Sequence, residues 1–417
     1  VFICVTACVA RAASKAAPVS GSKSVRRKGR VDLLHPKLAV DTNAGGFVTC
    51  SSVGEGHVLV GFEDAGGQAR ELVLHSTDKD QLWKRSLKLE LSLGVQESIG
   101  SCHINPERGL VFATKAVFDT EDSGCGDGKC WKVLYWRYGM DDGGLSVSSG
   151  PSEIEGVEGG QYTGFHLDSN GRVLVADHLQ GFAVYDLEDP ALRLVQNVRY
   201  SDAVPDLPSG WDLRPHIGRD LSEQYFAVPM LQFNRLNQSE DMPLILLYEQ
   251  AGGTLAFRQL LYLSDFVADE LPLGAYHDYL TVGIDRHAED TIMVGLVRTP
   301  RTEDSAGANM SKVFTLQRCG RKWIPRDSGL TLIDSLLYQS NDRAALAGAL
   351  SCDRGRCLIC SPELSPLPTC HLYARNDDDS WHILATLGSV SQSFGVSLRG
   401  STAVVRGRGF VRVYAAP

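Results

Sequence analysis

Short runs of apolar residues recur along the chain, and each run ends at an aromatic residue or a histidine that is followed by a polar turn. The seven residues that end these runs, called marker residues below, are His75, Tyr135, Tyr185, Tyr248, Phe314, Tyr373 and Tyr414. Successive marker residues are separated by 60, 50, 63, 66, 59 and 41 positions. Repeats of this length that are built from strands are typical of propeller blades. The pattern therefore predicts an all-β fold, a seven-bladed β-propeller.

A two-strand phrase precedes the marker residues of the first three repeats. It reads TCSSVGEGHVLVG from Thr49, SCHINPERGLVFA from Ser101 and GFHLDSNGRVLVA from Gly164. Each phrase has a strand, a turn of Gly, Asn, Asp or Pro, and a second strand rich in Val and Leu, which is the pattern of a β-hairpin. Looser versions begin at Tyr279, Leu336 and Phe394. With the marker strand and a fourth strand after the next turn, each blade is predicted to hold four antiparallel strands.

The ends of the chain predict how the ring closes. After Tyr414 only three residues remain, so the seventh blade lacks its outer strand. Residues 31–40 form the strand-like stretch ahead of the first blade, and we expect them to supply the missing strand. Pro36 fits an outermost strand, because one edge of such a strand makes no ladder hydrogen bonds.

Three segments resemble known propeller repeats. Residues 371–415 look like a degenerate FG-GAP-type repeat, and KVFTLQRCGRKW, which ends at Trp323, is similar to part of the same phrase. The residues that carry the first resemblance are Tyr373, Trp381, Phe394, Gly395 and Tyr414. GRVLVADHLQGFAVYDLEDPALRLV, from Gly171, is closer to the LVIVD-type repeat, and the calcium loop that often accompanies FG-GAP repeats has no counterpart here. The resemblance implies an extracellular or lumenal binding propeller.

The first thirty residues differ from the rest of the chain. Residues 1–13 hold a short apolar run followed by small residues, which predicts a truncated signal peptide, with a buried strand as the alternative. Residues 14–30 are rich in Ala, Ser, Lys and Arg and hold no acidic residue, as in a basic pro-segment or a transit-like linker. We therefore expect one propeller domain over 31–417, in a secreted or lumenal protein. Bipartite targeting to a plastid is the alternative location.

Net charge and length restrict the partners. Residues 1–30 hold seven of the 41 basic residues and none of the 50 acidic ones, so residues 31–417 carry a formal charge of −16. Such a charge repels phosphate backbones, and no nucleic acid partner is expected. The apolar run at residues 1–10 is too short for a transmembrane segment. Asn237 and Asn309 lie in glycosylation sequons, which agrees with secretion.

Cysteine spacing predicts several disulfides. Cys50 and Cys102 occupy equivalent places in neighbouring blades, where a bridge between blades is conceivable, and Cys125 and Cys130 flank a GDGK loop. Four more cysteines lie close together in one predicted inter-strand loop of the sixth blade, namely Cys352, Cys357, Cys360 and Cys370. Two disulfides are expected among these four, with a zinc site as the alternative because Cys357 and Cys360 have C-x-x-C spacing. Free thiols in a reducing compartment would be the alternative for all of them.

Candidate chemistry is sparse. His103 and His166 share one repeat position near the predicted channel rim, and His277 and Asp278 precede the corresponding strand of the fifth blade. These four are the candidate ligand-binding residues, although repeated histidines also have structural roles. Weak calcium binding by the acidic loop with Asp119, Asp122 and Asp127 is an alternative to a solvated loop.

The chain has no nucleophile, P-loop or dinucleotide motif, so no catalytic residue, metal or cofactor is assigned. We therefore expect a binding or scaffold module that recognises a protein or a glycan through loops on one face. The alternative is a hydrolase or lyase with its active site at the mouth of the central channel.

Overall fold

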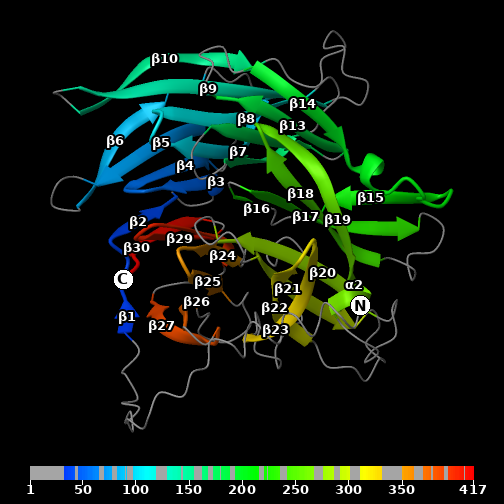
Figure 1. Cartoon of the computed structure of the whole chain (residues 1–417). Coiled ribbons are helices and arrows are strands. Elements are labelled where there is room, and N and C mark those ends of the chain that lie inside the picture. The colour runs from blue at the N-terminus through cyan, green and yellow to red at the C-terminus, as the bar shows by residue number, and fades with distance from the viewer. Residues whose placement is uncertain are drawn as a thin grey trace, which may run out of the picture.

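The computed structural model folds as a seven-bladed β-propeller (Figure 1). Seven sheets surround a common centre, with β3, β7 and β24 among the strands nearest to it and β6, β10 and β27 among the outer ones. Four-stranded antiparallel order is present in every blade, as the sequence predicts. The structure describes residues 32–417 apart from 43–45, 65–69, 78–81, 90, 92–96, 119–128, 142–143, 155–161, 168–171, 179, 188–192, 216–219, 223, 235–241, 267–275, 286–291, 301–309, 331–349, 361–369, 377–378, 389–392 and 408.

The blades follow one another along the chain. Blade one holds β3 (Phe47–Gly54), β4 (His57–Glu63), β5 (Arg70–Thr77) and β6 (Trp83–Leu89). Blade two holds β7 (Glu97–Asn105), β8 (Leu110–Phe118), β9 (Lys129–Asp141) and β10 (Gly144–Ile154). Blade three holds β11 (Tyr162–Leu167), β12 (Val173–His178), β13 (Gly181–Asp186) and β14 (Arg193–Arg199), and is followed by the 3₁₀ turn η1 (Tyr200–Ala203). Blade four has a divided inner strand, β15 (Trp211–Pro215) and β16 (Asp220–Leu221), then β17 (Tyr225–Asn234), β18 (Met242–Ala251) and β19 (Thr254–Tyr262).

The last three blades continue the same order. The short helix α2 (Leu263–Phe266) leads to blade five, with β20 (Tyr276–Ile284), β21 (Ile292–Pro300), β22 (Met310–Cys319) and β23 (Lys322–Leu330). Blade six holds β24 (Leu350–Asp353), β25 (Arg356–Cys360), β26 (Cys370–Arg375) and β27 (Trp381–Leu387). Blade seven holds β28 (Ser393–Arg399), β29 (Thr402–Gly407) and β30 (Phe410–Ala415). The first strand of each blade is the inner one, and the inner strands contact one another around the ring.

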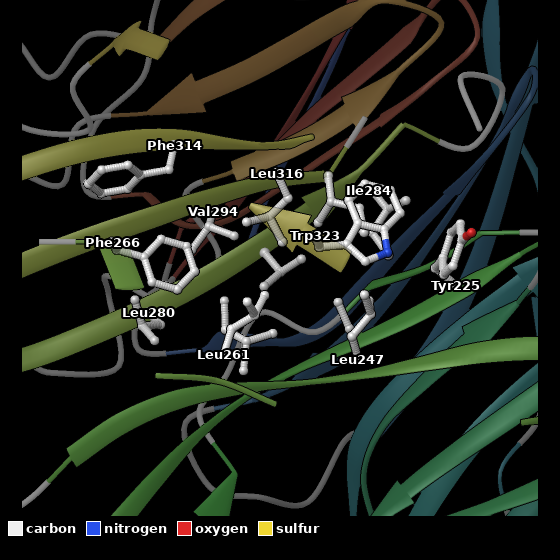
Figure 2. Close-up of a cluster of buried hydrophobic side chains, with 14 of the residues drawn as sticks. Tyr225, Leu247, Leu261, Phe266, Leu280, Ile284, Val294, Phe314, Leu316 and Trp323 are labelled. Carbon is white, nitrogen blue, oxygen red and sulfur yellow. The ribbon is translucent and has the colours of Figure 1, made fainter. Parts of the chain in front are cut away.

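The hydrophobic core consists of seven clusters, and each cluster lies between two consecutive blades. Figure 2 shows the cluster between blades four and five, where the rings of Tyr225 and Trp323 meet edge to face at 5.0 Å. The cluster between blades seven and one is smaller, and its fully buried members are six valines. Because every sheet is covered on both sides, the strands read as nearly continuous Val, Leu and Ile runs.

The marker residues all lie on the third strand of their blades, which confirms the repeat read from the sequence. The side chains of five of them are buried, namely His75, Tyr185, Tyr248, Phe314 and Tyr414. In blades one, three, four, five and six, the register between the third and fourth strands shifts immediately before the marker residue. Such a bulge increases the local twist of the strands, and here it lies next to the large side chain of the marker residue.

Two short N-terminal strands close the ring. β2 (Leu38–Asp41) pairs antiparallel with β30 and completes blade seven, which confirms the predicted closure. β1 (Asp32–Leu34) adds a fifth strand to blade six, parallel to β27. The sequence did not predict this strand. Leu34 packs in the cluster between blades six and seven, while Leu38 and Val40 pack in the cluster between blades seven and one. The N-terminal segment therefore joins three blades.

Blade six differs from the prediction in where its first hairpin lies. The sequence placed that hairpin from Leu336, in a stretch that lies outside the described residues, and treated the cysteine-rich stretch as a loop. The hairpin is in fact β24 and β25, joined by Arg354 and Gly355, which both have positive φ (54° and 69°). That turn is held by hydrogen bonds from both backbone N–H groups to Asp285 of blade five. Arg is not a usual residue for positive φ, and the contact from blade five helps to hold it in this conformation.

The four cysteines consequently lie in strands rather than in one loop. Cys352 and Cys357 are opposite each other in β24 and β25 and form a disulfide, and Cys360 and Cys370 do the same in β25 and β26. Two disulfides were expected here, and the zinc alternative is wrong because all four sulfurs are bonded. The disulfide between Cys50 and Cys102 is also present and joins blades one and two.

Candidate functional site

The two faces of the ring differ in the length of their connections. We call the loop face the one where the inner strands begin, and the turn face the one where they end. Connections on the turn face reach at most seven residues, between β20 and β21 (285–291). Those on the loop face reach 13 residues between β19 and β20 (263–275) and 19 between β23 and β24 (331–349). Long loops on a rigid scaffold are where binding residues concentrate, so the loop face is the candidate site.

The inner strands of four consecutive blades are irregular close to the loop face. Their pairing with the second strands shifts between Ser393 and Gly395 in blade seven, and between Val48 and Cys50 in blade one. Comparable shifts occur in β7 of blade two and in β11 of blade three. A bulge leaves backbone groups outside the ladder and redirects neighbouring side chains. Four of the seven inner strands are therefore irregular near the loop face.

Charged and aromatic side chains occur on the loop face of several blades. Lys115 and Glu97 form an ion pair of 2.7 Å in blade two, and their side chains are only 16% and 18% exposed. The guanidinium of Arg214 lies 4.1 Å from the ring centroid of Phe233 in blade four. Phe47, at the start of the inner strand of blade one, is 38% exposed. Arginine stacked on an aromatic ring and exposed aromatic residues are enriched in binding surfaces.

The structure does not bring the four candidate ligand-binding residues into one cluster. His103 and His166 lie on the neighbouring inner strands β7 and β11, near the turn face, and the ring of His166 lies 5.4 Å from that of Phe226. His277 and Asp278 lie inside β20 rather than ahead of it, at the opposite end of the strand and in a blade that is not adjacent. Each pair therefore belongs to a different end of the channel. Their role in ligand binding stays a prediction.

Three buried aspartates on the turn face were missed by sequence reasoning. Asp220 accepts a hydrogen bond of 2.9 Å from the backbone N–H of Ile284 in the next blade. Asp285 accepts the two backbone N–H groups of the blade six turn, and Asp353 accepts that of Gly400 in blade seven at 2.6 Å. Each carboxylate thus ties its blade to the next one. The sequence signal was an Asp at the end of an inner strand, but nothing in it identifies the backbone N–H groups that donate to the carboxylate.

Several predicted features fall outside the residues whose side chains are described. They are Cys125, Cys130, the acidic residues Asp119, Asp122 and Asp127, and the sequon residues Asn237 and Asn309. Within the described part of the chain, no group of three or more His, Cys, Asp or Glu residues could hold a metal ion. None of the helices described there has the length and hydrophobicity that crossing a bilayer requires.

No protein-family model and no curated protein matches the chain. Among solved structures the chain is similar to the polysaccharide lyase Uly1, with a TM-score of 0.53 and 10% identity over 98% of this chain and 95% of that one. It also matches prolyl oligopeptidase B from Galerina marginata (TM-score 0.49, 10% identity, 86% and 46% of the two chains) and Drosophila Plexin A in complex with Semaphorin 1b (TM-score 0.46, 9% identity, 93% and 88%). Without a matching family model, the FG-GAP or LVIVD type of the repeats stays a prediction. The first likeness concerns the fold alone, and the chain is a seven-bladed β-propeller.

Proposed function

We propose that the protein is a secreted or lumenal binding module whose loop face recognises a protein or a glycan. The observation that carries the proposal is the difference between the faces, since the longest connections gather where the inner strands begin. A scaffold of seven inter-blade clusters holds these connections. A rigid base reduces the entropy that loops lose on binding, which favours affinity.

The disulfides support an oxidising compartment. Cys50 and Cys102 join two blades, and two further bridges secure blade six. Cys319 is disulfide-bonded as well. Disulfides persist in secreted and lumenal proteins and are rare in reducing compartments. A −16 formal charge on residues 31–417 further disfavours nucleic acid as the ligand.

The alternative is a hydrolase or lyase with its active site at the channel mouth. Such an enzyme needs carboxylates or histidines that are free to face a substrate. The buried carboxylates of Asp220, Asp285 and Asp353 are instead occupied by backbone N–H groups of the following blade. The enzyme hypothesis rests on the histidines of β7 and β11 predicted from the sequence, and the fold likeness to a polysaccharide lyase adds nothing about activity at 10% identity.

The binding proposal is tested with the secreted protein, biotinylated and assembled on streptavidin. The tetramer is applied to a glycan microarray and to a panel of extracellular protein domains, and each hit is quantified by surface plasmon resonance. Phe47→Ala and Trp211→Ala, on the loop face, should weaken the hit at least tenfold, because aromatic anchors dominate interface energies. The control is Leu82→Ala, since Leu82 is 61% exposed and lies in a turn-face connection.

Loss of binding in the Leu82 variant with no loss in the loop-face variants would refute the proposed face. Absence of any hit, together with a cleaved product when the same ligands are incubated with the protein and analysed by mass spectrometry, would favour the enzyme alternative.

A further inference from the structure

A guanidinium lies at the loop-face mouth between the last blade and the first. Arg406 is the penultimate residue of β29, and it reaches across to blade one, where its Nη1 donates a 3.2 Å hydrogen bond to the backbone oxygen of Thr49. Thr49 is the third residue of β3, and Arg406 pairs in register with Gly395, the third residue of β28. The side chain therefore lies between two inner strands near their loop-face ends.

This charge has no ionic partner in the described part of the chain. No carboxylate there lies within 4.0 Å of Arg406, whereas the nearby Arg412 is paired with Asp41 at 2.7 Å. Burial lowers the pKa of Arg406, since the charged form loses hydration inside the ring. A cation that has left bulk water without a counter-charge destabilises the folded protein, and a bound anion would relieve that cost. Part of the surface of Arg406 remains exposed to solvent.

Because residue 395 is a glycine, no side chain from that position covers the Nε and Nη2 edge of the guanidinium. Nε and Nη2 face Gly395, and a Cβ added at that glycine would lie 3.4 Å and 3.5 Å from these two nitrogens. The edge formed by Nε and Nη2 is one that binds a carboxylate through two parallel hydrogen bonds. This edge makes no hydrogen bond among the described residues, since the bond to Thr49 uses Nη1.

The bulge in blade one adds a backbone carbonyl beside this guanidinium. Thr49 is the extra residue between Val48 and Cys50, so its backbone lies outside the ladder, and its carbonyl is the group that Arg406 contacts. The Oγ1 of Thr49 is buried and makes no hydrogen bond within the described part of the chain. The guanidinium thus contacts a backbone group that the bulge leaves outside the ladder, whereas the Oγ1 of Thr49 lies on the side of β3 that faces blade two, near Cys50 and Gly61.

We infer that Arg406 is the anchor of a site for a carboxylate group at the loop-face mouth of the channel, with Gly395 leaving the space in which the carboxylate meets Nε and Nη2. The site goes beyond the proposed binding function, because it would serve a bound ligand or an enzyme substrate equally. Its failure would therefore leave the binding proposal standing.

The test uses acetate as the probe and the full secreted protein. The melting temperature is measured at pH 7.5 in sodium acetate and in sodium chloride of equal ionic strength. Acetate should raise the melting temperature of the unmodified protein saturably, by about 1–3 °C, because a ligand that binds the folded state stabilises it by mass action. Arg406→Gln should abolish this difference. Arg412→Gln is the matched control and should keep it, since Arg412 already binds Asp41.

A second variant distinguishes loss of the proposed site from misfolding of the Arg406→Gln protein. Gly395→Ala keeps the charge but fills the space beside Nε and Nη2, and it should weaken acetate binding about tenfold or more in saturation-transfer NMR. Gly395 has no positive φ, so alanine is tolerated by its backbone. Equal acetate and chloride responses in the unmodified protein, or equal acetate binding by the unmodified and Gly395→Ala proteins, would overturn the inference.

Discussion

Removal of β2 should open the ring, and its effect can be worked from the contacts of the N-terminal segment. Starting the chain at Thr42 removes three partly buried apolar side chains, those of Leu34, Leu38 and Val40. It also removes the backbone hydrogen bonds from Lys37 to Val413 and from Gly388 to Leu34, besides the ladder with β30. At about 1 kcal/mol for each side chain and for each of about three hydrogen bonds, the loss is about 6 kcal/mol. With an unfolding entropy of about 0.8 kcal/mol/K for a chain of this size, the melting temperature should fall by about 7 °C.

Differential scanning calorimetry of three proteins checks this value. The control begins at Val31 and should melt like the full chain, because it keeps Leu34, Leu38, Val40 and the hydrogen bond of Lys37. Two point variants refine the test: Val40→Ala should lower the melting temperature, while Leu33→Ala should not, since Leu33 is 57% exposed. If the proteins that begin at Val31 and at Thr42 melt within about 1 °C of each other, ring closure by β2 contributes little and the reasoning is refuted.

Three further predictions concern modification, cross-linking and pH. In a secreted preparation, glycosidase should increase gel mobility, and the double variant Asn237→Gln, Asn309→Gln should show no shift; a protein without any shift would contradict secretion through a glycosylating pathway. Replacing Cys50 and Cys102 by Ala should lower the free energy of unfolding in urea by about 4 kcal/mol, because their bridge closes a loop of 52 positions. Burial lowers the pKa of His371, so the unfolded chain binds more protons below about pH 6.5 and stability should fall between about pH 7.5 and 5.5. The urea midpoint of a His371→Gln variant should change less over that interval, and an unchanged dependence would rule out this source.

The repeat of marker residues predicted the number of blades and their order because it reports a local property. Each marker residue lies on a third strand that is covered on both sides, so its run of apolar residues is long enough to be recognised in the sequence. Tyr185 and Tyr248 show this best, since both are essentially buried between blades. The closing strand was predictable for a different reason, namely that the last blade has one strand too few.

The placement of blade six was not predictable from local pattern. The stretch from Leu336 and the stretch from Leu350 both combine apolar residues with a turn, and periodicity does not distinguish them. The second one forms the hairpin because Asp285, which lies 69 positions before Arg354 in the chain, holds Arg354 and Gly355 in a conformation with positive φ. A contact between blades therefore decides the turn, and no local pattern contains it.

The candidate site was predictable only in outline. The sequence indicated loops on one face, and the strand bounds show which face has the long connections. It also singled out His103 and His166 by their equivalent positions, but it could not place His277 at the other end of the channel. Arg406 carried no signal, because its exposure and its contact with Thr49 depend on how the last blade meets the first.

The pairing of β2 with β30 also sets an order of events during synthesis. Leu38 and Val413, which are partners in this ladder, are separated by 375 positions (413 − 38). β2 therefore leaves the ribosome long before its partner strand, since β30 must be made before the two can pair. Until then the three buried valines of blade one lack the three valines of blade seven against which they pack in the finished ring. Contacts between residues so far apart in the sequence form slowly. Until they form, the unpaired β2 and the exposed valines of blade one are prone to aggregation. We expect the nascent chain to need protection of its N-terminal segment until the last blade has emerged.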